Sequence, residues 1–262
     1  MKIIIDCGHY YFTPGKRVPA ELDPEETREW VLNQLVGRQL QSLLSSHMLE
    51  VIRADDTTGK TEVTLKQRVA KVTSKDDLYI SIHHNAGANL TNAGGIVVYR
   101  YNESGKNLII YEAERLMQQL AYDNLIKETG LVGNRSNPMP YGDLYVVRES
   151  KCPAILCELG FMDSRSDWPY INSPDWPYKC AKGLYTAIME YLRHYGLLPE
   201  TEVKLVTDNI PSPWAAPAVS WGVDNGLLAG DETGNLLLHK TVTREQLMVI
   251  LKAYHEGVGR NG

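Results

Sequence analysis

The sequence predicts an α/β fold in which a twisted, mostly parallel central sheet is flanked by helices and followed by a small helical C-terminal module. Short Ile-rich apolar runs recur along the first three quarters of the chain. Runs of this length, bounded by Gly, Pro or polar residues, are typical of buried strands. Longer stretches with apolar residues three and four positions apart alternate with them, and this alternation of strands and helices indicates a layered fold.

The elements of the sheet domain follow one another along residues 1–197. Asp23 favours a helix start as an N-cap, Pro24 suits the first helical position, and Glu26 can complete a capping box, so we expect this helix to run to about Ser45. The other helices are expected over residues 65–72, 105–128 and 175–195. Strands are expected over residues 3–6, 49–52, 78–82, 94–99 and 153–157, with an apolar stretch at 144–147 and a Gly-, Asn- and Pro-rich surface loop near the cleft at 130–142.

Two further segments complete the chain. Residues 198–212 form a polar, Pro-bearing linker, and residues 213–262 form a small module. Within the module we expect two short helices, one from Trp214 to Asn225 and one from Thr243 to about Tyr254. A module of about 50 residues has little core of its own, so it is expected to dock on a partner or on a second copy.

Composition argues against several classes of partner. The net charge of −5 and pI near 5.8, without a basic stripe, argue against nucleic acid. No apolar run approaches the roughly 20 residues of a membrane span. The apolar run after Met1 is short and ends at the acidic Asp6, which argues against a secretory signal peptide. We therefore expect synthesis in the cytoplasm and release by another route. The cysteines form no Cys-x-x-Cys pair and are expected as reduced, buried thiols; they are Cys7, Cys152, Cys157 and Cys180.

Three apolar runs end on residues that can hold a metal ion or act beside one. The runs lead into His9, His83 and Glu158. Because ligands collect where parallel strands end at their carboxyl edge, these side chains predict one metal-centred cleft. Catalytic zinc takes three protein ligands and leaves one position for water, and imidazole nitrogen is a favoured ligand. His9 and His83 are therefore the first two candidate ligands.

The third candidate ligand is Glu29, on the first long helix. It lies at the leading end of the apolar stripe of that helix. The stripe continues through Leu32, Val36, Leu40 and Leu43. A carboxylate that faces a core is costly unless it meets a cation. Glu25 and Glu26 remain alternatives, although Glu26 already has a role in the expected capping box.

Cys7 and His84 are rival ligands. Cys7 lies close enough in sequence to the first histidine to share an ion, whereas the side chain of His84 should point away from its neighbour on an extended strand. Glu158 is expected to take a proton from the water and pass it to the leaving amine. The competing interpretation of Glu158 is an ordinary strand-end carboxylate that pairs with Arg148 or Arg165.

Four motifs follow one another along the chain. They are the Gly-His strand at 3–9, the Glu-x-x-x-Asn helix at 29–33, the Leu-x-x-Arg helix at 65–68 with the Ser-Ile-His-x-Asn-Ala strand at 81–86, and the Pro-Ala-x-Leu-x-Glu-x-Gly-Phe strand at 153–161. In this order they resemble the motifs of the zinc-dependent N-acetylmuramoyl-L-alanine amidases of bacterial wall hydrolases and phage endolysins. The resemblance covers residues 1–195. It implies a zinc-exopeptidase-like fold, one Zn²⁺ held by His9, Glu29 and His83, and Glu158 as the catalytic residue.

The resemblance also implies a substrate and a setting. The substrate would be peptidoglycan, cut at the amide between the lactyl group of N-acetylmuramic acid and L-alanine, and the protein would be a phage lysin that acts on the bacterial cell wall. Two other classes remain open. One is a zinc carboxypeptidase or aminopeptidase of the same architecture, and the other is a non-catalytic cell-wall-binding protein with a structural metal.

The tail resembles one S-layer homology repeat. The resemblance depends on Trp214-Ala215, residues 226–231 and residues 243–245. It implies binding of a cell-wall polymer, with Trp214 and Trp221 as stacking candidates or, alternatively, as plain core aromatics. Residues 199–262 contain eight acidic and five basic side chains, so they cannot hold an anionic polymer by charge alone.

Overall fold

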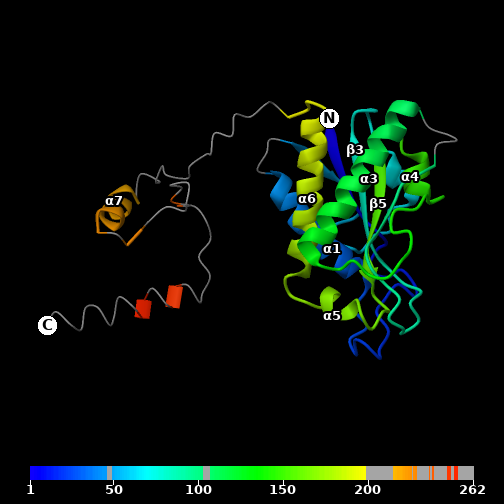
Figure 1. The fold of residues 1–262 in the computed structure, drawn as a ribbon, viewed down its shortest axis with the longest axis horizontal. Coiled ribbons are helices and arrows are strands. Elements are labelled where there is room, and N and C mark those ends of the chain that lie inside the picture. The colour runs from blue at the N-terminus through cyan, green and yellow to red at the C-terminus, as the bar shows by residue number, and fades with distance from the viewer. Residues whose placement is uncertain are drawn as a thin grey trace. The chain divides into compact units, whose positions relative to one another are not determined.

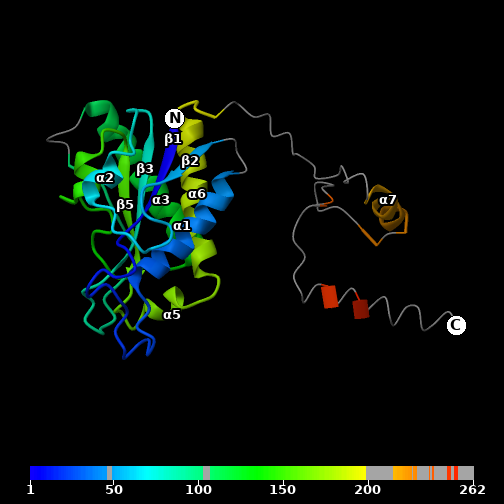
Figure 2. The ribbon, with the colours of Figure 1, turned by 180° about the vertical axis from the view of Figure 1, so that it is seen from behind.

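The computed structural model describes residues 1–45, 49–102, 107–198, 215–225, 227–228, 236, 238, 247–248 and 251–252. The chain divides into two compact units, Met1–Pro199 and Glu200–Gly262. The larger unit contains the whole of the described sheet, with helices on both of its faces (Figures 1 and 2).

The sheet of the larger unit has the strand order β2-β1-β3-β5-β4. Four strands are parallel, and they are β1 (Lys2–Cys7), β2 (Glu50–Arg53), β3 (Leu78–Asn85) and β5 (Ala154–Phe161). The edge strand β4 (Val97–Tyr99) runs antiparallel to β5. The predicted mostly parallel sheet is therefore confirmed. Because the four parallel strands end at one edge, the residues that follow them meet there.

Helices cover the two faces of the sheet unequally. The long helices α1 (Glu29–Ser45), α3 (Leu108–Thr129) and α6 (Trp176–His194) pack on one face and share the larger hydrophobic core with it. The short helices α2 (Leu65–Val69) and α4 (Tyr145–Glu149) lie on the other face over a smaller apolar cluster. The apolar stripe of α1 is thus buried against the sheet, as its spacing predicts.

Helix α1 begins five residues later than the sequence predicts, at Glu29 instead of Pro24. The carboxylate of Asp23 accepts hydrogen bonds from the backbone N–H groups of Glu25 and Thr27, and so closes a turn rather than a helix. Glu26 has a φ of 48° and pairs with Arg17 at 3.1 Å, so the expected capping box does not form. The prediction of helix over residues 24–28 was wrong. As a consequence, Glu29 is the first residue of α1.

Two other elements differ from expectation. Helix α2 ends at Val69 instead of continuing to Val72, and its capping box, formed by Thr64 and Gln67, was missed in the sequence. The apolar stretch at 144–147 belongs to the short helix α4. A further short helix, α5 (Trp168–Ile171), follows the end of β5.

The described part of the second unit contains the helix α7 (Ala216–Asp224). Trp221 lies on this helix with 58% of its surface exposed. Trp214, the linker from 199 onward and the expected helix start at Thr243 lie outside the described residues. Among the helices that the structure describes, none combines the length and the apolar composition that crossing a membrane requires.

Candidate metal centre

Three side chains that are distant in sequence meet at the carboxyl edge of the sheet. They are His9, which follows β1, Glu29 at the start of α1, and His83 near the end of β3. Glu29 Oε1 lies 3.0 Å from His83 Nδ1, and Glu29 Oε2 lies 3.2 Å from His9 Nε2. One donor atom from each residue lies within 4.8 Å of the other two. The structure therefore brings together the three residues that the sequence singles out as candidate ligands.

Arg68 supports the backbone of the turn that carries His9. Its guanidinium donates hydrogen bonds of 2.6 Å to the carbonyl oxygens of Cys7 and His9. The same group forms a buried ion pair of 2.6 Å with Asp6, whose other oxygen accepts a hydrogen bond from Ser81. Since His9 has a φ of 67°, which is unusual for a residue with a side chain, these bonds hold a strained backbone in place.

Gly8 leaves room for the ring of His83. A Cβ atom built on Gly8 would lie 2.0 Å from Cε1 of His83. No side chain fits at that distance, so only glycine allows the His9 turn and the His83 ring to approach each other. The close approach of the His83 ring thus explains on steric grounds why glycine precedes His9 in the first motif.

Glu29 is a buried carboxylate between two imidazoles, with only 1% of its surface exposed. Burial raises its pKa, but the interactions with the rings of His83 and His9 outweigh burial and hold the pKa well below its usual range. Burial likewise lowers the pKa of His83, and Glu29 reverses this, so that the pKa of His83 lies above its usual value. Negative charge is thus favoured at Glu29.

The donor set fits a zinc ion. Two imidazole nitrogens and one carboxylate oxygen are a known ligand set for catalytic zinc. Glu29 Oε2 is buried and makes no hydrogen bond of good geometry; Nε2 of His9 lies 3.2 Å away and the ammonium of Lys16 3.9 Å away. A buried, unsatisfied carboxylate oxygen is costly unless a cation compensates it, and a divalent ion between the three side chains would do so.

Glu158 lies beside the cluster on β5, directly opposite His83 in the parallel ladder. Its Oε2 is buried and has no hydrogen-bond partner. Burial raises its pKa to about 7, with His83 acting to lower it and Glu29 to raise it. A carboxyl group with such a pKa can both accept and release a proton near neutral pH.

The two arginines that could have paired with Glu158 are engaged elsewhere. Arg148 pairs with Asp143 and Glu149, and Arg165 donates to the carbonyl oxygen of Leu90. The interpretation of Glu158 as an ordinary arginine-paired carboxylate was therefore wrong.

The rival ligands lie outside the cluster. The thiol of Cys7 is buried against α1, where it donates to the carbonyl oxygen of Asn33 at 3.2 Å, and burial raises its pKa. Glu25 is exposed, and Glu26 pairs with Arg17. His84 is buried on the opposite face of β3 from His83, as expected for neighbours on a strand.

His84 belongs to a hydrogen-bond network that sequence reasoning missed. Its Nδ1 lies 2.8 Å from Asn33 Oδ1, and its Nε2 accepts from the indole N–H of Trp176 at 3.1 Å. Burial lowers the pKa of His84 to about 3, so the ring is neutral. The position of Asn33, four residues after Glu29 on the same helix face, was the one available signal for this network.

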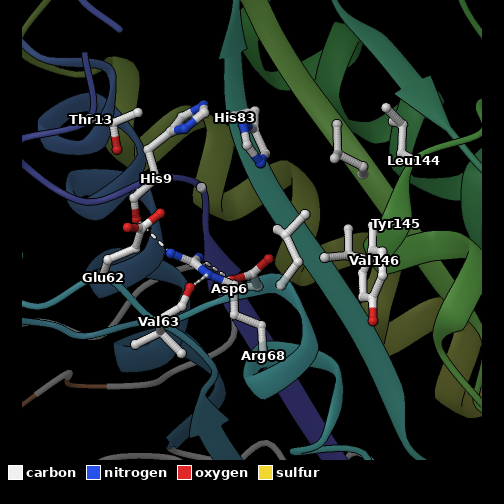
Figure 3. Close-up of a pocket in the computed structure, with 13 residues that line it drawn as sticks. Asp6, His9, Thr13, Glu62, Val63, Arg68, His83, Leu144, Tyr145 and Val146 are labelled. Atoms are coloured by element: carbon white, nitrogen blue, oxygen red, sulfur yellow. Dashed lines mark hydrogen bonds and ion pairs between the residues drawn. The ribbon is translucent and has the colours of Figure 1, made fainter.

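A cleft of about 270 Å³ opens beside the candidate ligands (Figure 3). His9 and His83 lie at one end of it, Val63 and Arg68 form one wall, and the residues around Tyr145 form the other. A second, polar hollow of about 500 Å³ is lined by Ala93, Tyr99 and five residues of the loop at 130–142 that the sequence places near the cleft. Those five are Asn134, Arg135, Ser136, Asn137 and Pro140.

Comparisons with known proteins identify the same region of the chain. A family model described as N-acetylmuramoyl-L-alanine amidase matches residues 3–190. An "Uncharacterized cell wall amidase" of Bacillus anthracis is 31% identical over 144 residues, which are 55% of this chain and 25% of that protein. The "Probable cell wall amidase LytH" of Staphylococcus aureus is 29% identical over 167 residues, 63% of this chain and 49% of that protein. The chain thus spans about a quarter of the first relative and half of the second.

The fold is also that of a solved amidase. The catalytic domain of CwlV, an N-acetylmuramoyl-L-alanine amidase from Bacillus (Paenibacillus) polymyxa var. colistinus, superposes with a TM-score of 0.59. The superposition covers 74% of this chain and 99% of the CwlV domain at 23% identity. It supports the α/β architecture of the larger unit.

Proposed function

The chain belongs to the N-acetylmuramoyl-L-alanine amidase family, and from that premise we propose that it hydrolyses peptidoglycan at the amide between the lactyl group of N-acetylmuramic acid and L-alanine. We assign one Zn²⁺ per chain to His9, Glu29 and His83, and the proton transfers to Glu158. The relatives named as cell wall amidases support the choice of substrate.

The residues of the site can divide the reaction between them. When bound, Zn²⁺ would supply Lewis acidity toward a water molecule and toward the scissile carbonyl oxygen. Glu158 would accept the proton of the attacking water as the new C–O bond forms. It would return that proton to the nitrogen of L-alanine as the C–N bond breaks, so the carboxylate is regenerated. Arg68 and Asp6 would keep the His9 turn rigid during this cycle.

One observation carries the proposal. Glu29 is a buried carboxylate between two histidines, and one of its oxygens makes no hydrogen bond of good geometry. One of these histidines, His83, lies on the strand that pairs with the strand of Glu158. This arrangement is unfavourable without a cation and suitable for catalysis with one. The cleft beside it gives the substrate access to the same atoms.

Mass spectrometry of digested peptidoglycan tests the proposal. The full chain loaded with Zn²⁺ should release stem peptides with a free amino group on L-alanine, and prior removal of zinc with a chelator should abolish the release. Fragments cut between two amino acids would instead identify a peptidase, and intact peptidoglycan would identify a non-catalytic binding protein. Each of those two results contradicts the proposal.

For residues 213–262 we propose a wall-binding or docking module behind the linker at 198–212. The exposed indole of Trp221 on α7 is available for stacking on a sugar ring. Sedimentation of the full chain with purified cell walls, with and without Trp221→Ala, tests this role; equal retention of both proteins would exclude Trp221. The function as a phage lysin is a proposal that depends on the sequence resemblance alone.

A further inference from the structure

A line of buried polar side chains connects helix α6 with the carboxylate of Glu29. The indole Nε1 of Trp176 lies 3.1 Å from Nε2 of His84, and Nδ1 of His84 lies 2.8 Å from Oδ1 of Asn33. The amide nitrogen of Asn33 lies 3.2 Å from the carbonyl oxygen of Gly8 and 3.4 Å from Oε1 of Glu29. All of the side chains in this line are buried. Three elements, α6, β3 and α1, thus meet behind the candidate metal ligands.

Each group in this line has a single hydrogen-bond role. An indole N–H can only donate, so Nε2 of His84 must accept. A neutral imidazole that accepts at Nε2 has its proton at Nδ1, which then donates to Oδ1 of Asn33. The amide NH₂ of Asn33 faces two acceptors, the carbonyl oxygen of Gly8 and the carboxylate of Glu29. The bonds therefore run in one direction, from Trp176 to Glu29, and no donor meets a donor.

The line does more than give its buried polar atoms hydrogen-bond partners, because it also fixes the orientation of the Glu29 carboxylate. Oε1 of Glu29 faces the amide of Asn33, the backbone N–H of His84 and the ring of His83. On the other side of the carboxylate, Lys16 lies 3.9 Å from Oε2 and offers an alternative partner. If Asn33 shifted, the carboxylate could turn toward Lys16 and away from the two histidines.

A second buried tryptophan shows that the indole of Trp176 did not need a partner simply because it is buried. Trp30, next to Glu29 on α1, is buried to a similar degree, and its Nε1 makes no hydrogen bond. The bond from Trp176 to His84 is thus a specific feature of this line.

We propose that His84 and Trp176 are positioning residues, which act through Asn33 to hold Glu29 in the orientation that binds a divalent cation together with His9 and His83. This inference rests on the metal site of the proposed function. Neither residue touches the cation or the substrate. Outer hydrogen bonds of this kind orient the ligands of a metal and raise its affinity.

The test compares the Zn²⁺ affinity of four full-length proteins by competition with a chromophoric chelator. Trp176→Phe keeps an aromatic ring and removes the N–H, and His84→Phe removes both ring nitrogens. We expect the dissociation constant of Zn²⁺ to rise by about 10-fold in the first variant and by about 10- to 100-fold in the second, the range found for outer partners of metal ligands. Trp30→Phe is the matched control, because it removes an indole N–H that makes no bond, and its affinity should equal that of the wild type.

Two further readouts separate positioning from general loss of structure. Thermal unfolding of the metal-free proteins identifies variants that remain folded, and the visible spectrum of bound Co²⁺ should change in Trp176→Phe and remain unchanged in Trp30→Phe. In the wild type, long-range ¹H–¹⁵N NMR should show His84 with its proton on Nδ1. This measurement needs no variant, so it decides the hydrogen-bond direction even if both substitutions prevent folding.

The outcomes distinguish this inference from the proposed function. Wild-type affinity in both Trp176→Phe and His84→Phe, or a proton on Nε2 of His84, would overturn the inference and leave the metal site intact. A wild-type protein that binds no Zn²⁺ would overturn both.

Discussion

Glu158 and His83 lie side by side on adjacent parallel strands, as direct partners in the ladder between β5 and β3. The proposed general base and a proposed metal ligand are thus carried by two neighbouring strands inside the sheet. Because both strands are buried and paired on both sides, the relative position of these two side chains is set by the backbone hydrogen bonds of the sheet.

Glu158→Gln should therefore remove proton transfer without disturbing the site. The amide has nearly the shape of the carboxyl group but cannot accept a proton, so we expect kcat to fall by roughly 10²- to 10⁴-fold, the contribution of a general base. Zn²⁺ content, measured by atomic emission, and the thermal unfolding midpoint should stay close to those of the wild type. Glu149→Gln, at an exposed position on α4, is the control. Activity of Glu158→Gln near the wild-type level would exclude Glu158 as the base.

The choice of the third ligand is tested by three parallel substitutions. Glu29→Gln removes the only carboxylate of the cluster, and we expect zinc binding to weaken by at least about 100-fold, because a neutral amide is a poor zinc ligand. Glu25→Gln and Glu26→Gln are matched controls that the sequence leaves open as alternatives. Both should bind zinc as the wild type does, because the first is exposed and the second pairs with Arg17. Isothermal titration with Zn²⁺ measures the affinity of all three variants. If only Glu26→Gln weakened zinc binding, Glu26 and not Glu29 would be the third ligand.

The sequence predicts the strands well because their signal is local. Short Ile-rich runs such as residues 3–6 and 78–82 favour buried strands, and both form strands with a neighbour on each side in the sheet. The start of α1 was missed because an aspartate can cap a helix or close a turn with similar bonds, and Asp23 does the second. The local pattern does not distinguish these two uses, and the choice depends on how the loop packs.

The network behind the site could not be predicted for a different reason. His84 and Trp176 are 92 positions apart, and neither the strand pattern nor the helix pattern specifies which α6 residue faces β3. Glu29 could be singled out because the apolar stripe of one helix shows that it faces inward. Its role as a ligand stays a prediction until zinc binding is measured. Pairings between elements depend on the tertiary packing, which a single sequence does not show.

Replacement of Arg68 should destabilise the fold. Arg68→Met would leave the carboxylate of Asp6 buried without its ionic partner and would release the carbonyl oxygens of Cys7 and His9. Breaking a buried ion pair in this way costs about 3–5 kcal/mol of unfolding free energy. Arg148→Met, at a more exposed ion pair, should cost no more than about 1 kcal/mol. Urea denaturation measures both, and equal losses would show that the buried guanidinium is not a structural support.

A close contact between Cys7 and Gly37 predicts a coupled pair of substitutions. A Cβ atom on Gly37 would lie 2.3 Å from Sγ of Cys7, so Gly37→Ala should destabilise the wild type. In a Cys7→Ala background the sulfur is absent, and the same change should become neutral or stabilising, because Ala is favoured over Gly in a helix by about 1 kcal/mol. The double-mutant cycle, measured by urea denaturation, should therefore give a large coupling energy. Additive effects would mean that the contact is relaxed in solution.

The dependence of stability on pH should report on Asp77, which lies just before β3. Its carboxylate accepts hydrogen bonds from the backbone N–H groups of Lys2, Thr73 and Ser74. Burial acts to raise its pKa, but these bonds outweigh it and hold the pKa below the usual value. A carboxyl group with a depressed pKa in the folded state stabilises the fold above its unfolded pKa of about 3.9, and this contribution is lost as the pH falls through the folded pKa.

The difference in unfolding free energy between the wild type and Asp77→Asn should thus be constant from pH 6 to about pH 5 and should shrink toward pH 3. Urea denaturation at each pH measures this difference, with Asp76→Asn, at an exposed neighbouring site, as the control. A difference that stays constant down to pH 3 would show that Asp77 is not the group whose protonation weakens the fold.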